Sequence, residues 1–199
     1  MARIKIIGLT GQSGAGKSTA ARLFEENGFT VINADHLVRN IYTTNPACLK
    51  AVAASFGQDI ILPDGTLDRR LLASRAFATA ENTALLGALV HPFVLAETLK
   101  ILKNVTGCAV LDAPQLFESS IDVICDRIVS VTADEAVRVR RIMERDDISG
   151  EQAKERVSAQ LSEDFFCAHS DDVIENNGGL APFEQQLREL IQTIKTEVM

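Results

Sequence analysis

The stretch that decides the fold of this chain is Gly11-Gln12-Ser13-Gly14-Ala15-Gly16-Lys17-Ser18. It matches the pattern Gly-x-x-x-x-Gly-Lys-[Ser/Thr], in which glycines let the backbone curl until its N–H groups point at phosphate oxygens. The helix expected to follow adds the partial positive charge of its N-terminus. Lys17 supplies a mobile cation for the β- and γ-phosphates, and Ser18 supplies a hydroxyl to Mg²⁺. The stretch therefore predicts a nucleoside-triphosphate site, and it leaves open which reaction follows.

The residues on either side of this loop have the context that a phosphate-binding loop needs. A β-branched strand is predicted over 3–9, and a helix over about 16–27. Further strands are predicted over 29–34, 108–111, 127–131 and 172–175. Further helices are predicted over 46–55, 68–77, 81–102, 134–145, 150–162 and 182–197. Strands separated by helices predict an α/β, three-layer fold with a five-stranded parallel sheet that helices cover on both faces.

Two stretches interrupt this alternation of strands and helices. Residues 36–104 contain helices but no convincing strand, and we expect them to form an inserted helical subdomain. Residues 138–162 are helical and rich in arginine, and we expect them to form a mobile lid. The chain is therefore interpreted as one domain, 1–199, that carries two insertions.

Composition and charge exclude several classes of protein. A chain of 199 residues with 46% hydrophobic and 24% charged side chains is typical of one globular domain. The net charge of −7 disfavours a nucleic-acid binder, and the apolar runs are too short for a membrane span or a secretory signal. Four cysteines without a Cys-x-x-Cys pair are typical of reduced thiols. We expect a cytoplasmic protein without a nucleic-acid, membrane or obligate protein partner.

Two carboxylates are expected at the carboxyl ends of strands. Asp112 ends the apolar run Cys108–Leu111, and an aspartate at this place beside a phosphate loop is typical of a Mg²⁺ ligand. Asp35 follows the second strand, where the carboxyl ends of parallel strands line a ligand crevice, so it can reach an acceptor hydroxyl. The alternative is that Asp35 caps a helix that starts at His36, and spacing alone favours neither interpretation.

Five other side chains give weaker signals. Arg141 and Arg145 lie four residues apart, on one helix face, where two guanidinium groups suit a triphosphate. Ion pairs with nearby acidic residues explain the same spacing. By composition alone, Arg69 is typical of a surface cation, Glu118 of a solvated helix residue, and His91 of a turn or kink before a proline.

Other classes of nucleotide-binding protein fit less well than a small-molecule kinase. A regulatory GTPase needs Asp-x-x-Gly after a strand, but the match Asp147–Gly150 lies in the helical basic segment, and the sequence has no Asn-Lys-x-Asp. A motor or transport ATPase normally needs further modules, for which the chain has little room. A kinase explains the core, the helical insertion and the arginine-bearing lid. A kinase for another nucleoside or alcohol, and a non-enzymatic nucleotide-binding module, remain as alternatives.

Several motifs in order resemble the dephospho-coenzyme A kinase family over nearly the whole chain. They are Ile7–Gly11 before the phosphate loop, Val31–Asp35, Asp64–Arg70, His91-Pro92, Asp112–Glu118, Arg141–Asp146, Gln160 and Asp172–Gly178. The family phosphorylates the ribose 3′-hydroxyl of dephospho-CoA with ATP, in the last step of coenzyme A synthesis. The resemblance implies the same fold and reaction here, with ATP and Mg²⁺ as cofactors and dephospho-CoA as the substrate.

The resemblance also implies roles for single residues. Asp35 matches the family's presumed general base, Lys17 a ligand of the triphosphate, and Arg141 and Arg145 the lid arginines, so these four are the implied catalytic residues. The implied ATP-binding residues are Gly11, Gln12, Ser13, Gly14, Ala15, Gly16, Lys17, Ser18, Thr19, Asn176 and Gly178. The implied substrate-binding residues are Asp35, Arg69, His91 and Glu118, and the implied metal ligands are Ser18 and Asp112.

Three short stretches depart from the family pattern. Asn33-Ala34-Asp35 stands where Asp-Ala-Asp is usual, Gln115 stands where the family has leucine, and Gln12-Ser13 stands where Gly-Ile is common. None of these changes removes the implied base, lysine or metal ligands. Asn33 is expected to alter the acceptor pocket slightly.

Overall fold

The computed structural model describes the backbone of residues 5–198 and the side chains of residues 5–197. The chain forms two compact units, which we describe separately. Unit 1 comprises Met1–Ile32 and Val105–Met199, and unit 2 comprises Asn33–Asn104. The first predicted strand includes Arg3 and Ile4, which lie outside the described residues.

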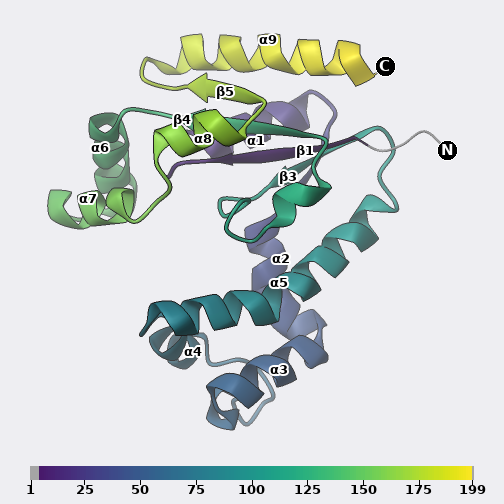
Figure 1. The fold of residues 1–199 in the computed structure, drawn as a ribbon, viewed down its shortest axis with the longest axis vertical. Helices are drawn as coiled ribbons and strands as arrows, with labels where there is room; N and C mark the ends of the chain where they lie inside the picture. Colours follow the sequence, from purple (N-terminus) through teal and green to yellow (C-terminus); the bar gives the residue numbers. More distant parts are fainter. Residues whose placement is uncertain (1–4, 199) are drawn as a thin grey trace. The chain divides into compact units, whose positions relative to one another are not determined.

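Unit 1 is built on a five-stranded sheet in the order β2-β3-β1-β4-β5 (Figure 1). The strands are β1 (Lys5–Gly11), β2 (Thr30–Asn33), β3 (Cys108–Asp112), β4 (Arg127–Thr132) and β5 (Asp172–Glu175). The pairs β1–β3, β1–β4 and β4–β5 are parallel, and their registers place Leu9 beside Asp112 and Gly11 beside Val131. The predicted α/β fold with a five-stranded parallel sheet is confirmed. The carboxyl ends of β3 and β4 flank the start of the phosphate loop.

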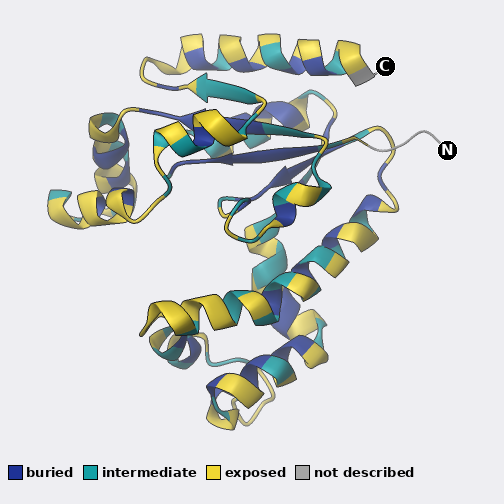
Figure 2. Ribbon diagram, in the orientation of Figure 1, coloured by how far each residue is buried: buried dark blue, intermediate teal, exposed yellow. Residues whose placement is uncertain are grey.

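Two helices pack on one face of this sheet, α1 (Lys17–Glu26) and α9 (Leu180–Val198). They bury apolar side chains against the alternate strand residues that face them, and Figure 2 shows the central strands buried. This core consists of Ile7, Leu9, Ala15, Ala20, Leu23, Phe24, Phe29, Val110, Val129, Val131, Ala133, Phe183, Leu187, Ile191 and Ile194. The intervening residue Ser130 points to the opposite face, where its hydroxyl lies 2.6 Å from that of Ser170, just after α8 (Glu163–His169).

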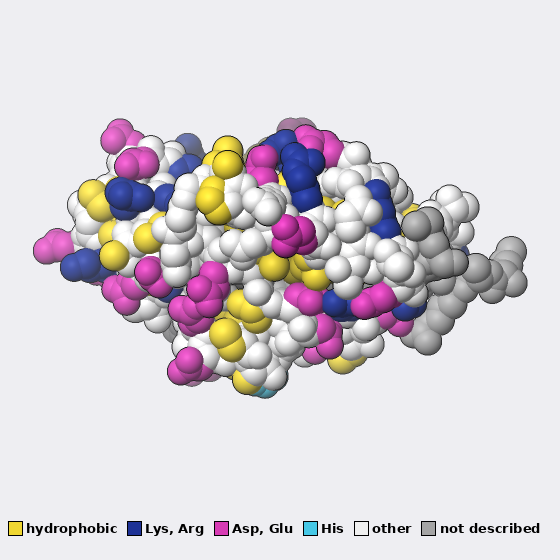
Figure 3. Space-filling view, turned by 90° about the horizontal axis from the view of Figure 1, so that it is seen from above, with side chains coloured by type: hydrophobic (Ala, Val, Ile, Leu, Met, Phe, Trp, Pro, Cys, Tyr) yellow, Lys and Arg dark blue, Asp and Glu magenta, His cyan; other side chains and the backbone are white. Residues whose placement is uncertain are grey.

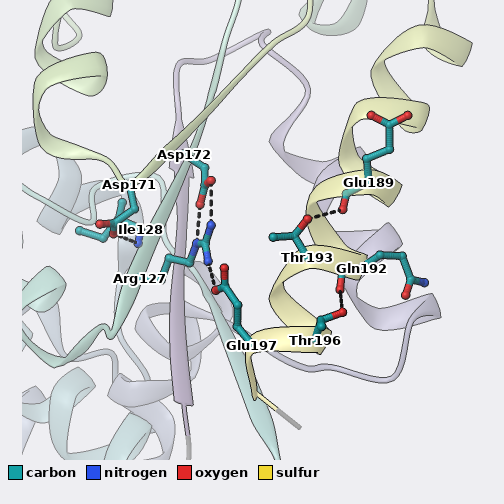
Figure 4. Close-up of polar contacts among 9 residues, drawn as sticks. All are labelled: Arg127, Ile128, Asp171, Asp172, Glu189, Gln192, Thr193, Thr196 and Glu197. Atoms are coloured by element: carbon teal, nitrogen blue, oxygen red, sulfur yellow. Dashed lines mark hydrogen bonds and ion pairs between the residues drawn. The ribbon is translucent and has the colours of Figure 1, made fainter.

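Arg127, the first residue of β4, links this strand to β5 and to α9 (Figure 4). Its Nε and Nη2 donate to the carboxylate of Asp172 at 2.5 and 3.0 Å, and its Nη1 pairs with Glu197. The carboxylate of Asp172 raises the pKa of Arg127. The bidentate geometry fixes the register in which β5 lies beside β4, at the end of the strands opposite the phosphate loop.

The segment predicted as a lid, 138–162, covers most of α6 (Glu135–Asp146) and all of α7 (Gly150–Ser158). The two helices pack on each other through Val139, Ile142, Ala153 and Val157. The prediction of one helix over 150–162 is wrong at its C-terminal end. Ser162 accepts a hydrogen bond from the backbone of Phe165 and caps a separate helix, α8. Helix α7 therefore ends at Ser158.

Unit 2 is helical, with α2 (Ala34–Thr44), α3 (Pro46–Phe56), α4 (Arg69–Ala76), α5 (Ala80–Leu102) and the short 3₁₀ helix η1 (Gln58–Ile60). Its core consists of Ile41, Tyr42, Cys48, Val52, Ala53, Phe56, Ile60, Leu72, Ala76, Val90 and Val94. His91 and Pro92 lie inside α5, so they do not form a turn. A second 3₁₀ helix, η2 (Ile121–Ile124), belongs to unit 1.

Helix α5 is long and apolar enough to cross a membrane by length and composition alone. Only 22% of its most apolar window is buried in the structure, but the helix packs against α2, α3 and α4 and contributes Val90 and Val94 to the core of unit 2. A core helix passes the same test, so this one helix is weak evidence for a membrane span.

Candidate active site

The phosphate loop joins β1 to α1 with its glycines in conformations that other residues rarely adopt. Gly16 has a φ of 115°, and a Cβ there would lie 2.5 Å from Nδ2 of Asn176. Gly14 has a φ of 80°, and a Cβ there would lie 2.9 Å from the carbonyl oxygen of Arg138. No side chain caps the N-terminus of α1, and its first turn has no acidic residue. Such a helix end presents backbone N–H groups and partial positive charge to an anion, as the sequence predicts.

Lys17 and Asp112 meet beside this helix end. The ammonium group of Lys17 pairs with Oδ1 of Asp112, and the two side chains are 15% and 6% exposed. Asp112 is held there because β3 runs beside β1, and the backbone N–H of the next residue, Ala113, donates to the carbonyl of Leu9 at 3.0 Å. The structure therefore brings together the cation and the carboxylate that the sequence singles out on separate grounds.

Only one of the two predicted lid arginines contacts the phosphate loop. Arg141 donates to the carbonyl of Gly14 at 3.2 Å and to Oδ1 of Asn176 at 3.3 Å. Asn176 is buried and donates in turn to the carbonyl of Ala15 at 2.6 Å. Arg145 is 59% exposed and forms a bidentate pair with its neighbour Asp146, which raises the pKa of Arg145.

Arg138 is a residue near the loop to which the sequence analysis assigned no role. It is 6% exposed, and its Nε donates to the carbonyl of Ala133 at 2.9 Å. Burial lowers the pKa of Arg138. A basic residue on a helix is usually solvated, and no motif marks Arg138 as the exception. Helical spacing does put it three residues before Arg141, on the same face, and that was the one signal available.

The remaining predicted residues of unit 1 lie on exposed or loop positions. Ser18 is exposed in the first turn of α1, and Thr19 is half-buried in the same turn, where its backbone N–H donates to Gly16 at 3.0 Å. Glu118 is exposed between β3 and η2, and Gly178 is exposed between β5 and α9.

The predicted residues of unit 2 are Asp35, Arg69 and His91. Asp35 is exposed in the first turn of α2, whose N-cap is Asn33: its side-chain oxygen accepts from the backbone of His36 at 2.9 Å. The alternative that Asp35 caps a helix starting at His36 is therefore wrong. Arg69 donates to the carbonyl of Arg39 at 2.6 Å, and its guanidinium carbon lies 5.9 Å from the ring centroid of Tyr42.

His91 is half-buried within α5, and this burial lowers its pKa. Its ring lies against Gly87 one turn earlier, where a Cβ would approach the ring to 3.0 Å. Burial thus favours the neutral imidazole of His91 over the charged one, relative to an exposed histidine.

Two side-chain oxygens near the phosphate loop, from Asp112 and Ser18, are of the type that could hold Mg²⁺. Among residues 5–198, no group of three or more His, Cys, Asp or Glu side chains is placed to hold a metal ion. Mg²⁺ usually takes one or two protein oxygens and completes its shell with water and substrate phosphates. The carboxylate of Asp112 and the hydroxyl of Ser18 are ligands of that kind.

This chain is similar to known proteins in both its sequence and its fold. The family model described as dephospho-CoA kinase matches residues 5–182. A dephospho-CoA kinase of Corynebacterium glutamicum is 38% identical over 196 residues, which cover 96% of this chain and 98% of that protein. A crystal structure from Thermus thermophilus aligns with a TM-score of 0.80 and 31% identity, covering 96% of this chain and 98% of the other.

A solved dephospho-CoA kinase from Campylobacter jejuni aligns with a TM-score of 0.72 and 25% identity over 98% of both chains. The family match extends across the phosphate loop, all of unit 2 and the segment 138–162. The agreement of sequence and fold over nearly the whole chain leads to one conclusion: this chain belongs to the dephospho-CoA kinase family.

Proposed function

We propose that this chain transfers the γ-phosphoryl group of ATP to the ribose 3′-hydroxyl of dephospho-CoA, giving coenzyme A and ADP. The observation that carries the proposal is the family match over residues 5–182, because it includes the phosphate loop and the helical unit together. A phosphate loop alone supports ATP binding by many kinds of protein. The additional helical unit supports a dedicated acceptor, and we infer that residues 36–104 form the acceptor-binding subdomain.

The donor side of the reaction rests on the phosphate loop and its neighbours. The backbone N–H groups at the start of α1 would bind the phosphates, and Lys17 would exchange its contact with Asp112 for the β- and γ-phosphate oxygens. Asp112 and Ser18 would hold Mg²⁺, which neutralises charge on the phosphate oxygens when it is bound. Of the two implied adenine-side residues, Gly178 lines a pocket of about 400 Å³ together with Asn177 and Pro182, and Asn176 donates to the carbonyl of Ala15 in the phosphate loop.

The acceptor side rests on unit 2 and on Glu118. Asp35 would accept the proton of the ribose 3′-hydroxyl late in a loose transition state, because its exposed carboxylate is free of any capping role in α2. Arg69, His91 and Glu118 would contact dephospho-CoA. The proposal for Arg69 is supported by the carbonyl of Arg39 and the ring of Tyr42, which hold its guanidinium group in a fixed position.

The test of the proposed function is ADP release from ATP and Mg²⁺ with dephospho-CoA as the acceptor. Parallel reactions contain adenosine, pantetheine phosphate or no acceptor. We expect strong stimulation by dephospho-CoA alone. Stimulation by another acceptor would be consistent with a kinase, but it would contradict dephospho-CoA as the substrate. The substrate-binding roles of Arg69 and His91 would be the first to fall. If ATP is bound but no acceptor stimulates ADP release, a nucleotide-binding module replaces the kinase.

The lid gives a separate prediction. Hydrogen exchange over residues 138–162 is expected to slow when a non-hydrolysable ATP analogue and Mg²⁺ are added, because Arg141 and Arg145 gain phosphate partners. Exchange in the central turns of α9 is the internal control and should stay constant. If exchange over 138–162 ignores the analogue while calorimetry shows that it binds, the segment is not a lid.

We further infer a cytoplasmic enzyme that acts on small molecules without nucleic acid or an obligate protein partner. On the face drawn in Figure 3, described Lys and Arg side chains are interspersed with Asp and Glu. This mixture and the net charge of −7 support the absence of a nucleic-acid surface.

A further inference from the structure

We propose that Gln160 and Gln12 are positioning residues, which clasp the base of the lid to the phosphate loop and thereby set the affinity for ATP. The clasp joins the second and third loop residues to the junction between α7 and α8. The backbone N–H of Ser13 donates to Oε1 of Gln160 at 3.1 Å. Nε2 of Gln12 donates to the carbonyl of Leu161 at 3.5 Å. The inference rests on the proposed use of ATP, but it concerns how the loop is held rather than which acceptor is phosphorylated.

Gln160 is held in its orientation by a second donor. Its Oε1 also accepts from Nη1 of Arg138 at 3.4 Å, while Nε of Arg138 is fixed by the carbonyl of Ala133. Arg138 is buried, so its charge needs the acceptors that surround it. A carbonyl oxygen with two donors, one of them a cation, is a stable anchor for the N–H of Ser13.

Gln12 makes the clasp from the loop side. Its side chain is 3% exposed, and its Oε1 has no hydrogen-bond partner among the described residues. Among the described residues, the buried hydroxyl of Thr132 likewise has no hydrogen-bond partner. Gly11 pairs with Val131, so Gln12, which directly follows β1, and Thr132, the last residue of β4, each come one residue after this pair. A buried amide whose oxygen has no partner stabilises the fold little. The hydrogen bond from Gln12 to Leu161 is therefore the contribution of this side chain that we test.

The lid also touches the next loop residue. Arg141 donates to the carbonyl of Gly14, and Gly14 packs against the backbone of Arg138. Residues 12–14 are thus contacted by the lid at three successive positions, from both of its ends. A loop held in its curled form does not have to be ordered when ATP binds, so the clasp lowers the cost of binding. Loss of the clasp is therefore expected to weaken the binding of ATP and to change the rate of the chemical step little.

The test compares three Gln→Met variants that keep the length of the side chain. Gln160→Met is expected to raise the KM for ATP and the Kd for ADP about tenfold, with kcat within about twofold, since one hydrogen bond of this kind is removed. Gln12→Met is expected to raise both constants about threefold, because its bond is longer. Gln152→Met is the matched control: Gln152 only closes the capping box of α7 with Ser149, so the affinity should not change.

Two further readouts separate positioning from a merely structural role. Gln12→Met removes a carbonyl without a partner, so the Tm without nucleotide should stay equal or rise while the affinity for ATP falls. The affinity for ATP then falls without any loss of stability, a result that partial unfolding cannot produce. In the double variant, the increase in Kd should be smaller than the product of the single increases, because both residues anchor the same junction.

The proposal is overturned if Gln160→Met binds ADP as the wild type does, or if Gln152→Met weakens binding equally. It is also overturned if kcat falls while the KM for ATP stays constant. The Kd for ADP is measured without an acceptor, so it judges the clasp even if dephospho-CoA is not the substrate. Should Gln160→Met fail to fold, Gln12→Met, which leaves the partners of Arg138 in place, decides the outcome.

Discussion

Replacement of Lys17 by alanine is expected to lower kcat/KM on the order of 10²-fold or more, because the cation that stabilises the transferring phosphoryl group is lost. The loop backbone and the N-terminus of α1 remain, so ADP should still bind, although more weakly. Steady-state kinetics with ATP and dephospho-CoA and calorimetric binding of ADP measure the two effects. Turnover close to that of the wild type would contradict the phosphate role of Lys17.

The ion pair between Lys17 and Asp112 calls for a stability control. Without the lysine, the carboxylate of Asp112 keeps 6% exposure and loses a charged partner, which costs up to about 3–5 kcal/mol of the free energy of unfolding in a fully buried pair. The variant Lys17→Ala/Asp112→Asn removes both charges and should regain most of the Tm without regaining activity. Lys100→Ala is the matched lysine control, because Lys100 forms only an exposed pair with Glu97, and its kcat/KM should stay within about twofold.

Replacement of Asp35 by asparagine is expected to lower kcat by about 10²–10⁴-fold while ATP still binds, because the acceptor hydroxyl loses its general base. The structure sharpens this test. Asn33 is the N-cap of α2, so Asp35→Asn leaves the cap intact and costs at most the small helix-dipole contribution of a first-turn carboxylate, about 0.3–1 kcal/mol. Single-turnover kinetics and calorimetry with ATP measure the two quantities.

The control for Asp35 is another carboxylate in the first turn of a helix of unit 2. Glu81 has that position in α5, so Glu81→Gln should leave kcat unchanged. Asn33→Asp restores the acid of the family pattern and keeps an N-cap, so it reports any role of that position separately. If Asp35→Asn keeps most of its activity, Asp35 is a first-turn helix residue and not the base.

The order and type of most elements could be predicted because the signals that specify them are local. Apolar runs and helical spacing are read over about ten residues, and they predicted the five strands and most helices. The misses occurred where a single side chain sets a boundary. Ser162 starts α8 and Asn33 starts α2 by capping, and neither signal stands out among neighbouring polar residues.

The sequence by itself determined the phosphate loop, because its function depends on closely spaced glycines and one lysine within eight residues, and it determined the parallel sheet behind that loop. Only the tertiary structure decided which distant side chains meet there. It paired Lys17 with Asp112, brought Arg141 to the carbonyl of Gly14, and set Gln160 against Ser13. These partners lie some 95 to 147 residues apart in the chain. Parallel strand register and helix packing bring them together, and local spacing in the sequence carries no record of either.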